Sequence, residues 1–366
     1  MKIASLLLAG ALLVGQAHKA LAQPAAPTPP PGSCGPVNGM SFVCGFKNPE
    51  DIVKIPGSRW LIASGMSPGG GLHLIDTAAK TQKVFYTEKT QARPDKSIYP
   101  NCAAPPDPAT FNAHGIALRP TTTPGVYKLL AVRHEIETVE VFTMDARGSE
   151  PDLAWIGCVP MPAGMKGNAI TAFSDGTILV TVTVGVGQSK VSMFDGGITG
   201  AVFSWTPGEN GFHELAGTEL SGNNGIEASP DEKEFYVAGS GDQTVTVFSR
   251  ADTTRPLRQV KSPFFNLDNL RWTDGHLIAA GMMYDEPACG GTRKQIFDRG
   301  GNPNACIRGF AAGELDPATM EWLIVGYGEP NPVFGGIATA VVVGDTLWLS
   351  SYSTDRVAYR PLPGAQ

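Results

Sequence analysis

One phrase recurs six times along this chain and restricts the folds that the chain can adopt. Each copy runs from an opening residue through a short apolar strand, a turn rich in Pro, Asp or Gly, and a stronger apolar strand. The copies lie about 57 residues apart on average and begin at Glu50, His114, Asn168, Asn224, Asp268 and Gly336. Each is followed by a further pair of strands. The repeat therefore predicts an all-β, six-bladed β-propeller with a central tunnel and four strands per blade.

The composition agrees with an all-β chain in a single domain. Glycine and proline, 44 and 30 in number, separate short β-branched and aromatic runs, and helical periodicity is scarce. We expect residues 46–366 to form one propeller domain, preceded by a Pro-rich leader and N-terminal segment at residues 23–45. The formal net charge of −6 and the absence of a basic cluster argue against nucleic acid as a partner.

The first 22 residues have the features of a secretory signal peptide. Lys2 precedes an apolar run, and a small-x-small sequence ends at Ala22, where we expect cleavage. No later segment is apolar enough to span a membrane, so we predict a periplasmic or secreted protein. The cysteines number six and all lie after Ala22, which favours disulfides in an oxidising compartment. Proximity in sequence predicts the pairs Cys34–Cys44, Cys102–Cys158 and Cys289–Cys306.

The residues that open the six phrases are expected to converge, because the innermost strands of a propeller run along its axis. Five of these six residues are polar, and unpaired polar or charged groups are costly inside a tunnel. A hard cation such as calcium, bound by six to eight oxygen atoms, would satisfy them. The predicted ligands are Glu50, Asn168, Asn224, Asp268 and Asn269. The alternative is that Asn and Asp open these strands only because they suit turns, and oxygen-rich sites also accept Mn²⁺ or Mg²⁺.

Five segments resemble the paraoxonase/arylesterase branch of the calcium-dependent, gluconolactonase-like six-bladed propellers. In chain order they are PEDIVKIPGSRWLIASG, FNAHGIALRP, LLAVRHEIETVEVF, NGIEASPDEKEFYVAG and LDNLRWTDGHLIAAG. The resemblance extends from about Glu50 to Tyr359. It implies a catalytic calcium on the five ligands named above. It also implies that the family's paired histidines, which handle the proton of an attacking water, fall on His114 and His134.

The chain departs from this family at three places. The family's second calcium would use Asp51 and the Ile116 carbonyl, but Ala169 stands where the family has a further acid. A disulfide joins the two ends in the family, whereas this chain has no cysteine after Cys306, so ring closure should rest on strand pairing between the first and last blades. Residues 282–284 also differ and lead into a long loop, where substrate choice is expected to differ.

The favoured hypothesis is a calcium-dependent hydrolase of lactones or aryl esters, acting on a small molecule. The calcium would polarise the carbonyl, and His114, supported by His134, would activate water. Two alternatives stay open. One is a lyase, isomerase or phosphotriesterase that uses the same metal tunnel, and the other is a non-enzymatic, secreted propeller that binds a ligand.

Other motifs are weaker. The sequence GMSPG around Ser67 matches the G-x-S-x-G nucleophile elbow, but a strand is expected after it where such an elbow needs a helix. His73, His213 and His276 match no motif and are expected to be strand or surface residues.

Overall fold

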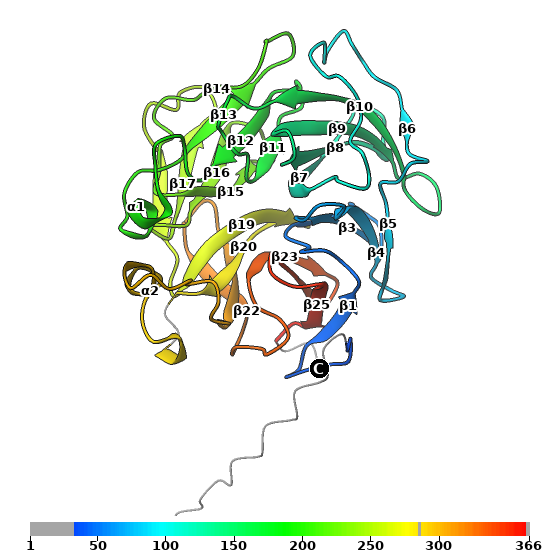
Figure 1. Ribbon diagram of the computed structural model, residues 1–366. Helices are drawn as coiled ribbons and strands as arrows, with labels where there is room; N and C mark the ends of the chain where they lie inside the picture. The colour runs from blue at the N-terminus through cyan, green and yellow to red at the C-terminus, as the bar shows by residue number, and fades with distance from the viewer. Residues whose placement is uncertain (1–32, 285–286, 364–366) are drawn as a thin grey trace, which may run out of the picture.

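The computed structural model describes residues 33–284 and 287–363 and arranges six sheets in a ring (Figure 1). The predicted all-β, six-bladed β-propeller is confirmed. The expected signal peptide, residues 1–22, lies outside the described residues.

The first three blades are formed by consecutive stretches of chain. The first contains β2 (Ile52–Lys54), β3 (Trp60–Gly65), β4 (Gly71–Asp76) and β5 (Thr81–Val84). The second contains β7 (Ala113–Pro120), β8 (Val126–Arg133), β9 (Thr138–Asp145) and β10 (Asp152–Pro160), with the short β6 (Gln91–Ala92) added in parallel at its edge. The third contains β11 (Ile170–Ala172), β12 (Ile178–Val182), β13 (Ala201–Trp205) and β14 (His213–Glu214).

The last three blades have four strands each. The fourth contains β15 (Asn223–Ala228), β16 (Glu234–Gly239), β17 (Thr244–Ser249) and β18 (Arg258–Lys261). The fifth contains β19 (Phe265–Thr273), β20 (His276–Met283), β21 (Phe310–Leu315) and β22 (Trp322–Gly328). The sixth contains β23 (Ile337–Val343), β24 (Thr346–Ser351), β25 (Arg356–Pro361) and, as its outermost strand, β1 (Ser41–Cys44).

The ring is closed by strand pairing between the two ends of the described chain. Strand β1 runs antiparallel to β25, with Ser41 opposite Tyr359 and Cys44 opposite Arg356. The N-terminal strand thus completes the last blade, and the expected start of the propeller at residue 46 falls after this strand. Phe42 of β1 is buried and its ring lies 5.7 Å from that of Phe334, so closure also buries apolar surface.

Four of the six innermost strands contain a β-bulge at the same level. The register shifts between Ala113 and Ile116 in β7, between Asn223 and Ile226 in β15, between Leu267 and Leu270 in β19, and between Ile337 and Ala340 in β23. A bulge places two residues of one strand opposite one of its partner and redirects their side chains. Consecutive residues can therefore face the tunnel together, which strict alternation would prevent.

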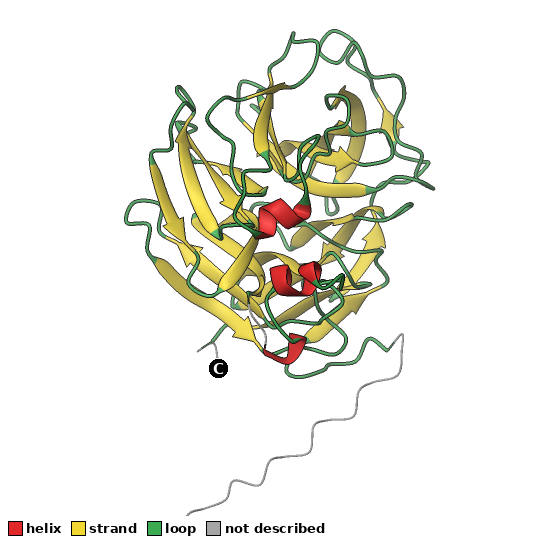
Figure 2. Ribbon diagram, turned by 60° about the vertical axis from the view of Figure 1, so that its left-hand side comes forward, coloured by secondary structure: helices red, strands yellow, loops and turns green. Residues whose placement is uncertain are grey.

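Two short helices connect strands above the same end of the tunnel. Helix α1 (Lys190–Phe194) lies between β12 and β13, and α2 (Arg293–Asp298) lies between β20 and β21, after the 3-10 turn η1 (Pro287–Cys289). The Phe194 and Phe297 rings lie 5.9 Å apart, and Figure 2 shows the two helices close together. Both connections leave their blades at the end where the innermost strands begin.

The three disulfides join Cys34 to Cys44, Cys102 to Cys158 and Cys289 to Cys306, as predicted. Three disulfides indicate an oxidising environment. Glu140 lies against the second disulfide, but both thiols of that cluster are used in the covalent bond. Within residues 33–284 and 287–363, no helix has the length and apolar character needed to cross a membrane.

Phe42→Ala tests the closing strand. Loss of this buried ring should lower the free energy of unfolding by about 3 kcal/mol, since it leaves a cavity between β1 and the sixth blade. Urea unfolding followed by fluorescence measures the change. The control is Leu323→Ala, because Leu323 is 63% exposed on β22; equal effects of the two substitutions would contradict the role of β1.

Candidate metal centre and histidine pair

Besides Asn112 Oδ1, just before β7, four buried side-chain oxygens at the start of the innermost strands have no hydrogen-bond partner within the described part of the chain. They are Glu50 Oε2, Asn168 Oδ1, Asn224 Oδ1 and Asn269 Oδ1. Each belongs to a predicted calcium ligand, and the four come from four different blades. A buried oxygen without a partner costs free energy. The donor set, two carboxylates with Asp268 included and three carboxamides, therefore fits a hard, oxygen-binding cation.

Contacts behind these residues hold the carboxamide groups in place. Asn269 Nδ2 donates to Glu50 Oε1 at 2.8 Å and to Thr339 Oγ1 at 3.0 Å. Asn224 Nδ2 donates to Ser240 Oγ at 2.9 Å, and that hydroxyl donates to the Leu267 carbonyl at 2.6 Å. Because the amide nitrogens of Asn224 and Asn269 are used in this way, their amide oxygens stay available for a cation.

The sixth blade contributes Thr339 to this cluster of polar side chains, and the sequence did not lead us to predict it. The sixth phrase opens with Gly336, which offers no side chain, whereas Thr339 lies three residues later within the β23 bulge. Its hydroxyl accepts from Asn269 and donates to Asp51 Oδ1 at 2.9 Å. A small polar residue in an otherwise apolar run, IATAVVV, is the signal that could have identified it.

The two predicted acidic ligands, Glu50 and Asp268, carry an electrostatic cost that a cation would relieve. Burial raises the pKa of Glu50 to about 7. Burial, and then repulsion by Glu50, raises the pKa of Asp268 to about 8. Two like charges in a low-dielectric tunnel disfavour each other's ionised form. A divalent cation would balance both carboxylates.

The two predicted histidines lie in contact beside this cluster. His114 Nε2 is 3.6 Å from Glu50 Oε2, and His114 Nδ1 is 2.8 Å from His134 Nε2. His134 Nδ1 in turn lies 3.1 and 3.2 Å from the two carboxylate oxygens of Glu137. Burial lowers the pKa of His114, so its neutral form dominates at neutral pH. When each ring donates its Nδ1 proton towards Glu137, His114 Nε2 is left as a proton acceptor beside the ligand cluster.

Glu137 is a second residue that sequence reasoning missed. It lies in the turn between β8 and β9, where its φ is 49°. The turn reverses the chain direction, so the Glu137 carboxylate contacts the ring of His134, three residues earlier. A carboxylate three residues after a histidine, in the run RHEIE, is the signal in the sequence.

The expected second calcium at Asp51 and Ile116 does not fit this structure. The guanidinium of Arg271 lies in that position: Nη2 donates to Asp51 Oδ2 and, at 2.7 Å, to the Ile116 carbonyl. Arg271 is only 1% exposed. A calcium ion here would have to displace a buried cation or lie beside it, which Coulomb repulsion disfavours.

Arg271 belongs to a chain of buried charges along the tunnel. Its Nη1 lies 3.3 Å from Glu227 Oε1, and Arg119 Nη2 lies 2.6 Å from Glu227 Oε2. Asp51 also accepts from the Ile116 amide at 2.8 Å. Burial raises the pKa of Asp51 to about 6, and the Arg271 charge opposes that rise. The arrangement supports the chain segment that carries Glu50.

Comparison with known proteins identifies the fold. No protein-family model matches the sequence, and no curated protein sequence matches it. Among solved structures, a luciferin-regenerating enzyme aligns at 13% identity and a TM-score of 0.50 over 89% of this chain and 96% of its own. A gluconolactonase from Xanthomonas campestris aligns at 16% identity and a TM-score of 0.51 over 88% and 89%. The chain has a gluconolactonase-like propeller fold.

A third similar structure is regucalcin from Agrobacterium tumefaciens, described as a calcium-binding protein, at 12% identity and a TM-score of 0.48 over 89% of this chain and 95% of its own. Unrelated functions occur on one fold, so the function of this chain has to be argued from its own site.

The rival motifs have structural explanations. Ser67 lies in the turn between β3 and β4, and strand β4 follows where a nucleophile elbow needs a helix. His73 is buried in β4, where its ring contacts Gln82 and the Gly70 carbonyl. His213 and His276 are exposed residues of β14 and β20. The expectation that these histidines are strand or surface residues is confirmed.

The raised pKa values predict how pH affects stability without metal. Glu50, Asp51 and Asp268 bind protons more tightly in the folded chain than in the unfolded chain, whose carboxyl pKa values are about 4. The metal-free protein should therefore lose stability as pH rises from about 4 towards about 8. Calcium should reverse most of this loss because it binds the ionised carboxylates. Thermal unfolding at several pH values, with chelator and with calcium, measures both effects; identical curves would contradict the site.

Arg271→Met tests the buried cation. It leaves Asp51 and Glu227 without their shared partner, so the free energy of unfolding should fall by about 3–5 kcal/mol. The matched control is Arg147→Met, because Arg147 pairs with Asp145 on the surface and such pairs contribute about 0–1 kcal/mol. Elemental analysis of the unsubstituted protein should find one calcium per chain; two would contradict the assignment of this position to Arg271.

Proposed function

We propose that this protein is a calcium-dependent hydrolase of lactones or aryl esters. The observation that carries the proposal is the cluster of partnerless oxygens, placed beside the Nε2 atom of His114. A cation site alone would serve structure, and a histidine pair alone would be an ordinary buried contact. Here the two occur together, since Glu50 Oε2 of the cation site lies 3.6 Å from His114 Nε2 of the histidine pair. This proximity favours a catalytic role.

Calcium bound by Glu50, Asn168, Asn224, Asp268 and Asn269 would supply the positive charge that polarises a substrate carbonyl and stabilises its developing oxyanion. His114 accepts the proton of the attacking water at Nε2. Its burial keeps the ring neutral beforehand, so that the ring can act as a general base. Glu50 and Asn269, joined by a hydrogen bond, hold the ligand oxygens at the tunnel mouth.

His134 and Glu137 support that proton transfer. As His114 gains a proton at Nε2, its Nδ1 proton is stabilised by His134, which is itself oriented by the Glu137 carboxylate. In this series His114 is the base, His134 is the ring that orients it, and Glu137 is the carboxylate at the end. The Glu137 side chain is partly exposed. We infer that this relay disperses the positive charge, which lowers the cost of forming an imidazolium in a buried position.

The histidine relay separates this proposal from a ligand-binding propeller, in which calcium would need no base. A lyase, an isomerase or a phosphotriesterase would need the same ligands, and the site's donor set does not distinguish among them. A hydrolase must place solvent oxygen in its product, so turnover in heavy-oxygen water followed by mass spectrometry separates hydrolysis from elimination or isomerisation. Three disulfides support a periplasmic or secreted location.

The test is hydrolysis of phenyl acetate and of five- and six-membered lactones by the protein as purified, after exhaustive chelation, and after calcium is restored. Activity should disappear and return with calcium. Asp268→Ala should abolish both calcium binding and activity, because it removes one of two balancing charges. A metal-replete and fully active Asp268→Ala variant would contradict the assignment.

His114→Gln provides the second part of the test. It should lower kcat by roughly a hundred- to ten-thousandfold, the usual range for a general base, while calcium content stays at one per chain. Glu137→Gln should lower kcat by about ten- to a hundredfold, since it acts through His134. Unchanged turnover in His114→Gln would remove the histidine from the mechanism.

A further inference from the structure

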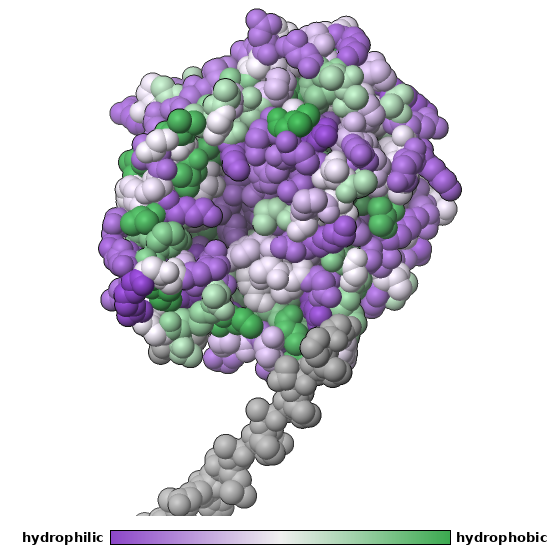
Figure 3. Space-filling model, in the orientation of Figure 1, coloured by the Kyte–Doolittle hydropathy of each residue, from purple (hydrophilic) through white to green (hydrophobic). Residues whose placement is uncertain are grey.

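The two connections that carry α1 and α2 meet at the rim of the tunnel mouth. Lys294 Nζ lies 3.3 Å from Asp195 Oδ1, just after α1, and the Phe194 and Phe297 rings are in contact. Thr292 caps α2 through a reciprocal pair of hydrogen bonds with Gln295. Figure 3 shows a hollow lined by hydrophilic residues in the middle of this view of the ring. The connections therefore hold residues of α2 in fixed positions beside the mouth.

Arg293, the first residue of α2, turns its guanidinium inward. It is only 6% exposed. Its Nη2 lies 3.5 Å from Met282 Sδ, which also accepts from the Tyr352 hydroxyl at 3.5 Å. Within the described residues no carboxylate lies within 4.0 Å of this guanidinium, and its Nε has no hydrogen-bond partner. A buried guanidinium without an anion is unusual, because burial of an uncompensated charge is costly.

Arg293 is linked to the metal centre through Asn266. With its amide oriented to satisfy both atoms, Asn266 accepts from Arg293 Nη1 at 3.1 Å and donates to the Ser240 carbonyl at 2.6 Å. Ser240 is the residue whose hydroxyl holds Asn224. Two intervening residues, Asn266 and Ser240, therefore connect the guanidinium to Asn224 of the ligand cluster.

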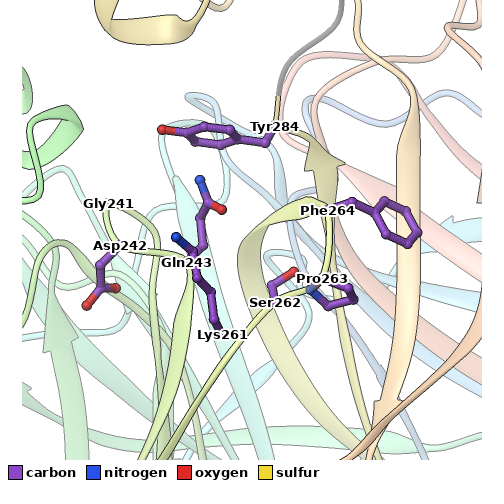
Figure 4. A pocket seen from close by; sticks show the side chains of 8 residues that line it. All are labelled: Gly241, Asp242, Gln243, Lys261, Ser262, Pro263, Phe264 and Tyr284. Carbon is purple, nitrogen blue, oxygen red and sulfur yellow. The ribbon is translucent and has the colours of Figure 1, made fainter.

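An open cavity of about 570 Å³ adjoins this link. Gly241 follows Ser240 directly and lines the cavity together with Gln243, Lys261, Phe264 and Tyr284. Figure 4 shows the Tyr284 ring across from the Gln243 carboxamide, above the opening between the fourth and fifth blades. Asp242 also lines the cavity, so its walls combine charged, amide and aromatic groups around a space that can hold part of a small molecule.

The charges of the site are unbalanced once a divalent cation is bound. Glu50 and Asp268 together offset the two charges of calcium, and Arg293 then adds one positive charge without a counterpart in the described residues. An anionic group on the substrate would supply that counterpart. A carboxylate suits a guanidinium best, because the two planar groups can form charge-assisted hydrogen bonds.

We propose that Arg293 selects substrates that carry a carboxylate near the scissile lactone or ester bond. This inference rests on the proposed hydrolase function and specifies the substrate class for that site. The substrate carboxylate binds the guanidinium at the rim of the mouth, and the carbonyl to be attacked faces the ligand cluster and His114. Arg293 is thus a specificity residue that contacts the substrate away from the reacting atoms.

The test compares γ-butyrolactone-γ-carboxylate with its neutral γ-carboxamide, two substrates of nearly equal size and carbonyl reactivity. The protein should prefer the carboxylate. Arg293→Gln should raise KM for the carboxylate by roughly ten- to a hundredfold, as expected for a lost hydrogen bond to a charged group, and leave the carboxamide within about twofold. Arg293→Lys should keep part of the preference. The control, Lys190→Gln, changes an exposed charge on the neighbouring helix α1 and should keep the preference intact.

A binding measurement makes the inference testable even if no lactone is hydrolysed. The hydrolysis-resistant γ-lactam-γ-carboxylate should bind the calcium-loaded protein in calorimetry and bind Arg293→Gln at least tenfold more weakly. Equal affinity for the two proteins, or equal loss of activity on charged and neutral substrates, would overturn the role of Arg293 and leave the hydrolase proposal standing. If circular dichroism shows that Arg293→Gln does not fold, Arg293→Lys provides the test. A KM of Arg293→Lys for the carboxylate substrate equal to that of the unsubstituted protein would overturn the inference.

Discussion

The cost of placing like charges and partnerless oxygens in one narrow tunnel is the constraint on which the rest of this structure depends. Glu50 and Asp268 are brought together by a ring of six innermost strands, and the pKa of each rises because burial penalises its ionised form. Hydrophobic packing of the blades supplies the stability that offsets this cost. The tunnel is therefore strained electrostatically until a cation binds, and binding of that cation adds to folding stability.

The tunnel contains two different solutions to the problem of buried carboxylates. At the mouth, Glu50 and Asp268 lie next to amide oxygens, and this set of oxygens suits a metal ion. An ion bound there would remain accessible to small molecules. Below them, Asp51 and Glu227 share Arg271, a cation that belongs to the chain and cannot dissociate. A guanidinium donates hydrogen bonds along fixed directions, so it fixes geometry and offers no open coordination position. Of the two sites, only the one at the mouth therefore suits the hydrolysis that we propose.

The sequence allowed the ring to be predicted, together with the convergence of the polar residues proposed as metal ligands, because both depend on one repeat. The polar residues that open the phrases occupy equivalent places in successive blades, so their convergence follows from the topology. Residues that act across blades were not found in this way. Thr339, Glu137 and Arg271 acquire their roles through a bulge, a tight turn and a contact between β19 and the start of β2, respectively. Such pairings join distant positions and leave no periodic signal.

Closure of the ring and assembly of the site depend on the same contacts. The Glu50 carbonyl accepts from Ser350 Oγ at 2.5 Å, and Asp51 accepts from Thr339, so the sixth blade holds the segment that carries the first metal ligand. The sixth blade is complete only when β1, eight residues after the first described residue, pairs with β25. The contacts that position Glu50 therefore join the start of the first blade to the two inner strands of the sixth blade, so the candidate site depends on the same junction of blades that the closed ring brings together.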